Sequence, residues 1–142
     1  SRRIGGGTRF VIRLPAVPAP QRLRRISYLS EATQPLSPEA LSQLLRVARA
    51  RNEAAGLSGV LMHSRSRFFQ VLEGPHDALH ATMERIYRDR RHKNVELILD
   101  VEVEHPGYQG WALQFTRIDD DLIERIRHGG PSALEDILPA RR

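Results

Sequence analysis

The sequence predicts an α+β domain with a ferredoxin-like β-α-β-β-α-β-β sheet, with two helices on one face and C-terminal helices on the other. Three observations predict this fold class. Short segments alternate apolar and polar residues as strands do, longer segments repeat apolar residues at helical spacing, and glycine or proline stands between them. The 142 residues suit one domain with a single buried core.

The first two elements are expected to be a strand and a helix. Arg24–Ser30 has strand periodicity, because Ile26 and Tyr28 share one face and their neighbours share the other. Ser37 then begins a helix, since its hydroxyl can cap free backbone amides and a proline follows in the first turn. Gly56 ends that helix.

A hairpin of two strands follows the first helix. Leu57–His63 and Arg67–Glu73 are separated by only three residues. In the second of these strands Phe68, Gln70 and Leu72 share a face, and the residues between them are also apolar. This strand is therefore expected to lie in the centre of the sheet, covered on both sides.

The second half of the chain supplies another helix and two more strands. Pro75 starts the helix, and residues 94–103 and 111–117 form the strands. Residues 119–128 begin with acids and end with basic residues, as the helix dipole favours, and a short helix at 132–138 is expected after them. These C-terminal helices are expected to cover the sheet face opposite the two main helices.

Three regions differ in charge and in expected role. Residues 1–23 are expected to be a flexible basic leader or a cloning remnant, 24–117 the core, and 118–142 a helical segment for capping, dimerisation or output. Residues 1–25 hold seven arginines and no acid, whereas the rest has 15 basic and 17 acidic residues. The net charge of +5 therefore belongs mostly to the leader, and nucleic acid is not an expected partner.

Composition excludes several kinds of chemistry and location. Cysteine is absent, which excludes disulfides, thiolate catalysis and sulfur-ligated metal centres. No apolar run is long enough to span a membrane, and no secretory signal is present. A cytoplasmic protein without a membrane partner is expected.

Three polar residues interrupt the predicted apolar interior. Gln70 lies on the central strand, Asn52 ends the apolar face of the first helix, and Tyr28 shares a strand face with an isoleucine. Each alone could satisfy backbone groups, because a buried amide left without partners costs about 1–3 kcal/mol. Three such residues on one side of one sheet favour a bound polar heterocycle that serves them all.

At this point the sequence resembles a known family. The resemblance covers residues 24–117 in order and with the family's spacing, and it is to the BLUF domain, the sensor of blue light using FAD. The segments that carry it are Ile26–Ser30, Ala50–Gly59, Arg67–Gly74, Arg85–His92 and Gly110–Gln114.

The resemblance assigns expected roles by position. Tyr28 would be the photoactive tyrosine, Gln70 the switching glutamine and Trp111 the tryptophan of the last strand. Further residues would bind the flavin: Asn52 at a ring carbonyl, Arg85 and Asp89 as a helical pair at the pyrimidine part, Leu44, Phe68 and Ile86 as walls, and Arg51 and His92 as less specific contacts.

The resemblance also implies a mechanism and partners. Light would drive an electron and a proton from Tyr28 toward FAD, with FMN and riboflavin as alternatives, and Gln70 would rearrange its hydrogen bonds. Nothing is consumed, so the domain would be a reversible switch and not an enzyme. A signalling partner or the C-terminal segment would receive the signal. An apolar outer sheet face favours a homodimer or larger homo-oligomer.

Two residues depart from the family pattern. Arg51 stands beside the key asparagine, where relatives often carry histidine or asparagine. Leu113 stands where many relatives carry the methionine that accompanies the last-strand tryptophan. Leucine lacks a sulfur acceptor, so the recovery rate and the output route are expected to differ.

Other functions stay open with less support. A light-insensitive flavin-binding module or a ferredoxin-like interaction module is the main alternative. An enzyme of the acylphosphatase kind would need a glycine-rich phosphate loop, which Glu31–Pro35 does not provide. A nucleic-acid module would need aromatic residues on the sheet and basic flanks. His76 and His80 are four apart on a helix but lack a third ligand, so no metal site is expected.

Overall fold

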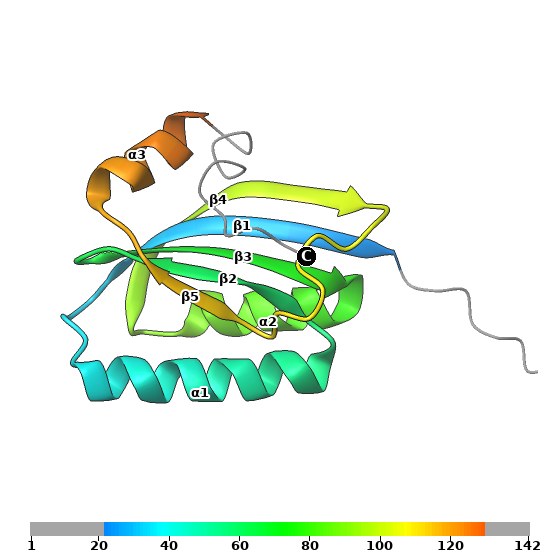
Figure 1. Ribbon diagram of the computed structural model, residues 1–142, viewed down its shortest axis with the longest axis horizontal. Coiled ribbons are helices and arrows are strands. Elements are labelled where there is room, and N and C mark those ends of the chain that lie inside the picture. Colours follow the sequence, from blue (N-terminus) through cyan, green and yellow to red (C-terminus); the bar gives the residue numbers. More distant parts are fainter. Residues whose placement is uncertain (1–21, 130–142) are drawn as a thin grey trace, which may run out of the picture.

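The computed structural model describes residues 22–129, and within them the chain forms a five-stranded sheet and three helices (Figure 1). The elements follow the β-α-β-β-α-β-β order, so the predicted ferredoxin-like α+β fold is confirmed. In chain order they are β1 (Leu23–Ala32), α1 (Pro38–Ala55), β2 (Ser58–His63), β3 (Arg67–Pro75), α2 (His76–Arg88), β4 (His92–Val103), β5 (Gln114–Arg117) and α3 (Asp120–Gly129).

The sheet places β3 in its middle. The strand order is β4-β1-β3-β2-β5, with β2 and β5 parallel and the other neighbours antiparallel. Gln70 on β3 stands opposite Tyr28 on β1 and opposite Leu61 on β2. The central position expected for this strand is confirmed, and the same register brings the tyrosine beside the glutamine.

Local signals fix both ends of α1. The Ser37 hydroxyl accepts a hydrogen bond from the Ala40 amide at 3.0 Å, and Pro38 occupies the first turn. Gly56 closes the helix with φ of 74°, a left-handed conformation that suits glycine. The helix therefore has the bounds that the sequence predicts, and Asn52 lies in its last turn.

The two faces of the sheet carry different layers. Helices α1 and α2 cover one face, and α3 lies against the other (Figure 1). The expected position of the C-terminal helix is thus confirmed. On the α3 side, Ile123 and Ile126 are completely buried. They join an apolar cluster with Leu29, Val60, Met62, Phe69, Val71 and Tyr108.

Some predictions fall at or beyond the limits of the described residues. Strand β1 begins at Leu23, so the last predicted leader residue belongs to the sheet. The rest of the leader, up to residue 21, and the predicted helix at 132–138 lie outside the described residues. Between residues 22 and 129 no helix is long and apolar enough to cross a membrane.

Two predicted element boundaries are wrong by a few residues. Strand β5 begins at Gln114 and not at Trp111, because the chain first makes a turn in which the Trp111 amide bonds the Tyr108 carbonyl at 3.0 Å. Helix α2 ends before Asp89, whose amide bonds the Ile86 carbonyl at 3.1 Å as the helix closes. Asp89 is therefore a capping residue and not part of the helix.

Candidate functional site

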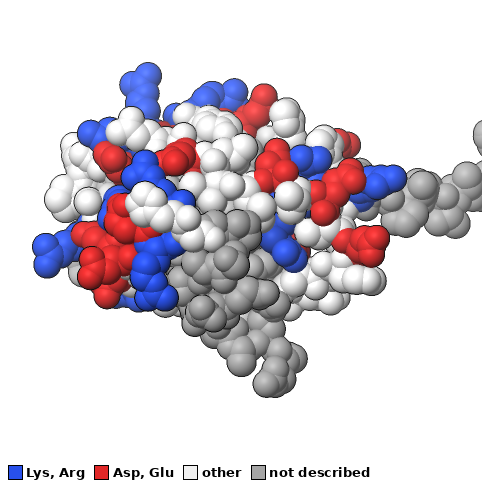
Figure 2. Space-filling view, turned by 90° about the horizontal axis from the view of Figure 1, so that it is seen from above, with Lys and Arg blue, Asp and Glu red and all other residues white. Residues whose placement is uncertain are grey.

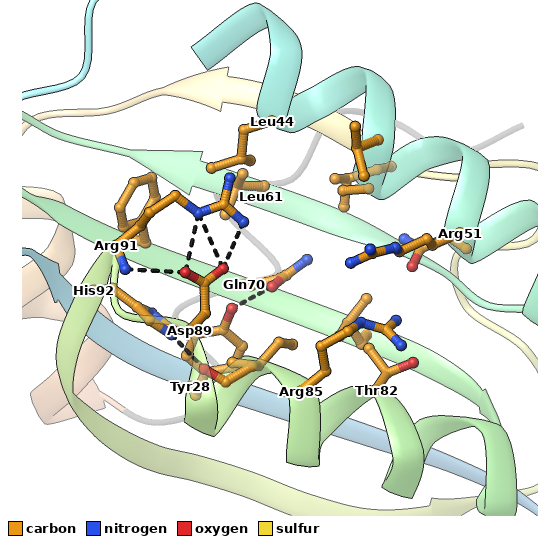
Figure 3. Close-up of a pocket in the computed structure, with 17 residues that line it drawn as sticks. Tyr28, Leu44, Arg51, Leu61, Gln70, Thr82, Arg85, Asp89, Arg91 and His92 are labelled. Atoms are coloured by element: carbon orange, nitrogen blue, oxygen red, sulfur yellow. Dashed lines mark hydrogen bonds and ion pairs between the residues drawn. The ribbon is translucent and has the colours of Figure 1, made fainter. Parts of the chain in front are cut away.

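A pocket lies between α1, α2 and the sheet face that they cover (Figure 3). Of the eleven predicted site residues, ten line this pocket and one, Trp111, does not. The fold therefore brings together nearly all of the residues that the sequence predicts for the site. The ten are Tyr28, Leu44, Arg51, Asn52, Phe68, Gln70, Arg85, Ile86, Asp89 and His92.

Tyr28 and Gln70 form the centre of the pocket floor. They are direct register partners on β1 and β3, and their side chains are only 4% and 7% exposed. The Tyr28 hydroxyl donates a short hydrogen bond to the Gln70 side-chain oxygen Oε1. Since the oxygen faces the tyrosine, the side-chain NH₂ group of Gln70 faces the pocket (Figure 3).

Burial determines the protonation state of Tyr28. Removal of the phenol from water raises its pKa far above the usual range, and the nearby carboxylate of Asp89 and the Tyr87 side chain raise it further. The phenol is therefore neutral at ordinary pH and keeps its proton for the bond to Gln70. A neutral phenol is a hydrogen-bond donor, as this geometry requires.

Asn52 connects α1 to the chain segment that precedes β5. Its side-chain nitrogen Nδ2 donates to the Ala112 carbonyl at 2.6 Å, and Arg49, one turn earlier, donates to the Leu113 carbonyl at 2.9 Å. The Asn52 side chain is 4% exposed and lines the pocket. One of its two N–H groups is engaged with Ala112, so the other and the side-chain oxygen stay available to a ligand.

Asp89 pairs with Arg91 and not with Arg85. Both Asp89 oxygens accept from Arg91, at 2.5 Å from Nη2 and 3.0 Å from Nε, and the Arg91 amide adds a bond of 2.9 Å. The side-chain bond from Arg91 lowers the pKa of Asp89. Arg85 and Asp89, which the resemblance places together at the pyrimidine part of the ring, both line the pocket. The chain turns between Asp89 and Arg91, which brings these two side chains together.

His92 lies behind Tyr28 rather than free in the pocket. One ring nitrogen contacts the Ser30 hydroxyl at 2.8 Å and the other contacts the Ile86 carbonyl at 2.7 Å. Its ring meets the Tyr28 ring edge to face, with centroids 6.1 Å apart. His92 therefore supports the position of the tyrosine.

Apolar side chains from both helices and the sheet form the walls. The predicted wall residues Leu44, Phe68 and Ile86 are among them. The sequence reasoning did not assign five further lining residues. They are Val47, Ala48, Leu61, Leu72 and Thr82.

Helical and strand periodicity could have found most of the missed residues. Val47 and Ala48 follow Leu44 by three and four positions on α1, so they lie on the same helix face. Thr82 precedes Arg85 by three on α2 in the same way. Leu61 stands opposite Gln70, which places it on the pocket face of the sheet.

Trp111 packs on the other face of the sheet. Its ring lies against the α3-side cluster, at 6.1 Å from the centroid of Tyr108. The Trp111 carbonyl accepts from the Gly59 amide at 2.9 Å, which ties the segment to β2. Leu113, two residues later, is buried and lines the pocket. The short segment 111–113 therefore contacts both faces, with the tryptophan outside the pocket.

Comparisons with known proteins agree on one family. The profile described as sensors of blue-light using FAD, BLUF, matches residues 23–114. Photoactivated adenylate cyclase subunit beta from Euglena longa is 36% identical over 99 residues, which are 68% of this chain and 12% of that protein. The alpha subunit from Euglena gracilis is 31% identical over 102 residues. The chain thus spans about an eighth of the length of the first of these relatives.

Solved structures have the same fold. BlrB, a BLUF protein in its dark state, superposes with a TM-score of 0.65 at 22% identity, covering 84% of this chain and 87% of that one. The BLUF domain of BlrP1 gives a TM-score of 0.64 at 26% identity, covering 84% and 76%. The similarity therefore extends over most of both chains.

Proposed function

The chain belongs to the BLUF family of blue-light flavin photoreceptors, and on that premise we propose that Tyr28 and Gln70 form its light-driven switch. The proposal assigns to Tyr28 the role of electron and proton donor. It assigns to Gln70 the role of a relay that changes its hydrogen bonds. The pocket in which both side chains lie would hold the flavin ring.

The orientation of Gln70 is the observation that supports this proposal best. Its oxygen accepts from Tyr28, so its NH₂ group is directed into the pocket. No residue between 22 and 129 accepts a hydrogen bond from that group. A ligand with carbonyl oxygens or ring nitrogens would supply the missing acceptor.

The other lining residues fit the same ligand. Arg51, Asn52 and Arg85 place further N–H donors in the pocket. Leu44 and Ile86 supply apolar surface from opposite helices. A flat ring with apolar faces and a carbonyl-bearing edge suits this pocket. The apolar walls would contact the faces of the ring, and the N–H donors would contact its edge. Phe68 would close one side of the ring.

The residues then act in a defined order. When bound, the flavin supplies blue-light absorption and accepts an electron in its excited state. Tyr28 would give up an electron toward the flavin and its hydroxyl proton to Gln70, with which it already shares a hydrogen bond. Both would then return to Tyr28, which regains its neutral phenol. Gln70 would be left with changed hydrogen-bond partners for its oxygen and nitrogen until the dark arrangement is restored. Neither side chain is consumed, so the domain acts as a reversible sensor rather than as a catalyst.

We propose FAD as the bound flavin, with FMN and riboflavin as alternatives. The residues assigned above contact the ring, which all three molecules share, so the ring contacts do not discriminate among them. His92 and Arg91 lie at one end of the pocket (Figure 3) and are the candidates near the ribityl chain.

The output is assigned to a partner protein or to a segment beyond the sensor domain. The relatives are named photoactivated adenylate cyclase subunits, and this chain matches 12% of the first of them. A homodimer or larger homo-oligomer is also proposed. The apolar outer sheet face no longer supports an oligomer, because α3 covers that face. Exposed Tyr87, Leu97 and Val101, on α2 and the edge strand β4, are an alternative contact surface. A cytoplasmic location stays a prediction.

Reconstitution with FAD tests the proposed function. The purified chain, refolded with FAD, is expected to be yellow and to shift its absorption reversibly to the red under blue light. Uptake of no flavin would refute the proposal. Stable flavin binding without any light-induced shift would favour the light-insensitive flavin-binding alternative.

A further inference from the structure

Two arginine side chains face the pocket without a partner. Arg51 comes from the last turn of α1 and Arg85 from α2, and both line the pocket. Within residues 22–129 neither side chain makes an ion pair or accepts or donates a hydrogen bond. Figure 3 shows Arg51 directed across the pocket toward Gln70, with Arg85 rising from the opposite helix on the same side.

Other arginines of the fold behave differently. Arg24, Arg25, Arg67, Arg91 and Arg127 each pair with a carboxylate. Other arginines without partners are also exposed, as Arg51 and Arg85 are. Arg51 and Arg85 differ in that they line a pocket, whose ligand would displace part of the water around them. Their charges would then act on the ligand.

The pocket contains no spare negative charge to neutralise them. Asp89 is the one carboxylate among the lining residues, and both of its oxygens are occupied by Arg91. This ion pair is neutral as a unit. Arg51 and Arg85 therefore leave the lining with a net charge of about +2 at neutral pH, from two guanidinium groups that remain charged.

Three donor groups thus face a common space. They are the guanidinium groups of Arg51 and Arg85 and the NH₂ group of Gln70. Neutral acceptors would satisfy the hydrogen bonds, but an acceptor that carries negative charge gains more from two cations. The lining therefore favours a ligand edge that is, or can become, negatively charged.

We propose that Arg51, acting with Arg85, stabilises negative charge on the carbonyl-bearing edge of the bound flavin. This inference rests on the proposed function, since it assumes that a flavin ring occupies the pocket. It makes Arg51 a residue that tunes the bound flavin rather than one that only encloses it. The imide proton N3–H, between the two ring carbonyls, reports this effect, because its loss leaves a negative charge on that edge.

Titration of the N3 proton tests the inference. Its pKa is measured from the absorption spectrum in the dark, in the wild-type chain and in Arg51→Gln, over the pH range in which circular dichroism shows an intact fold. Loss of the cation is expected to raise the N3 pKa by about one pH unit, the lower end of the effect of a neighbouring charge, because Arg51 is exposed to water.

The matched control is Arg46→Gln. Arg46 lies on the same helix but outside the pocket, where its side chain contacts Gln43. This variant removes the same net charge and is expected to leave the N3 pKa unchanged. A shift in Arg51→Gln no larger than the shift in Arg46→Gln would overturn the inference.

Other titrating groups around the pocket do not produce the same signal. Burial keeps Tyr28 neutral well into the alkaline range, and Asp89 is held ionised by Arg91. His92 also lines the pocket, and the flavin-free chain is the control for any contribution from its ring. The transition assigned to N3 should also disappear when the flavin is removed.

Binding of three flavins separates the ring edge from the phosphates. Riboflavin, FMN and FAD share the ring, but only the last two carry phosphate. If Arg51 acts on the ring edge, Arg51→Gln weakens the affinity for all three by a similar factor, several-fold in each case. A loss confined to FMN and FAD would place the guanidinium on phosphate and overturn the inference. Arg51→Lys, which keeps the charge, is expected to retain most of the lowered N3 pKa.

The same samples separate this inference from the proposed function. If the wild-type chain binds flavin and shows the N3 effect but no light-induced shift, the photoswitch fails and the Arg51 inference stands. If the light-induced shift is normal and Arg51→Gln leaves the N3 pKa unchanged, only the inference fails.

Discussion

The two faces of the sheet differ in what their side chains contact. The face covered by α3 is packed with apolar side chains that water does not reach. Those that are completely buried include Val60, Met62, Phe69, Val71 and, from α3 itself, Ile126. The opposite face has apolar walls as well, but its centre carries a tyrosine, a glutamine and an asparagine around an open pocket. One face therefore stabilises the fold, and the other keeps polar groups available for a ligand.

Strand β3 serves both faces through its alternation. Gln70 points to the pocket, whereas Phe69 and Val71 on either side of it point to α3. The glutamine is thus held in place by neighbours that pack tightly behind it. This packing fixes the backbone position from which the Gln70 side chain reaches the pocket. Figure 2 views the molecule from the α3 side, where acidic and basic side chains are interspersed around the described part of the surface.

Phe69→Ala is expected to destabilise the α3 face of the sheet more than any other change proposed here. The change removes a completely buried aromatic ring and leaves a cavity, so a loss of about 3–5 kcal/mol in the free energy of unfolding is expected. Urea unfolding of the apoprotein measures it. Gln70→Leu, one position away on the pocket face, is the matched control and is expected to cost about 1–2 kcal/mol, because the buried Tyr28 hydroxyl loses its acceptor. Equal losses in the two variants would refute the division between the faces.

Glu73→Gln would remove a buried charge on the α3 face and is expected to have the next-largest effect on stability. The buried Glu73 carboxylate binds Arg25 at 2.6 and 2.8 Å and accepts from the amides of Gly107 at 2.7 Å and Tyr108 at 3.2 Å. Loss of the charge is expected to cost about 2–3 kcal/mol, because the Arg25 guanidinium loses its carboxylate. Thermal unfolding measures the change. Glu102→Gln, whose carboxylate pairs with Arg22 at the surface, should have little effect.

Tyr28→Phe would alter the pocket face with a smaller effect on stability. The change removes the donor to Gln70 and leaves its oxygen without a partner, at an expected cost of about 1–2 kcal/mol. Flavin affinity is expected to stay within several-fold of the wild type, while the light-induced shift disappears. Absorption spectroscopy after blue light measures both properties. A normal photocycle in this variant would remove Tyr28 from the mechanism.

Much of the difference between the two faces could be predicted from the sequence. The alternation of Phe68, Gln70 and Leu72 predicts a central strand, and the capping signals predict the ends of α1. The pocket residues follow from the same periodicity together with the family resemblance. These features are local, so short stretches of sequence determine them.

The features that the sequence reasoning missed depend on how the chain turns. Asp89 is four residues after Arg85, a spacing that predicts a helical pair, but the helix closes one residue earlier and Arg91 takes the carboxylate. Trp111 lies in a turn held by backbone bonds to Tyr108 and Gly59, so strand alternation does not determine its face. Tertiary hydrogen bonds of this kind leave no periodic signal.

Acidification is expected to reduce the stability contributed by the two faces of the sheet in different pH ranges. These changes are expected to be smaller than those of the substitutions above. Burial lowers the pKa of His63, which stacks on Phe68 of the pocket wall, so its contribution is complete above about pH 6.5 and is lost as pH falls below that value. Hydrogen bonds from Ser64 and Arg67 lower the pKa of Asp120 and Glu124 on α3. Their contribution is present above their ordinary values of 3.8 and 4.5 and is lost below them.

Two measurements separate these ranges. Urea unfolding is expected to show a loss below about 1 kcal/mol between neutral pH and pH 5.5 that is absent in His63→Gln. Trp111, the one tryptophan in the sequence, lies on the α3 side, and its fluorescence is expected to change only at lower pH. A single transition for both signals near pH 6 would contradict the separation of the faces.

The most direct test of the proposed switch is the absorption difference between light and dark in Gln70→Leu beside the wild type. Leucine keeps the size and the apolar neighbours of the side chain but cannot bond Tyr28 or the flavin. We predict that the variant retains bound flavin and loses the reversible red shift that the wild type displays. A red shift of normal size and recovery in Gln70→Leu would contradict the central role of this glutamine.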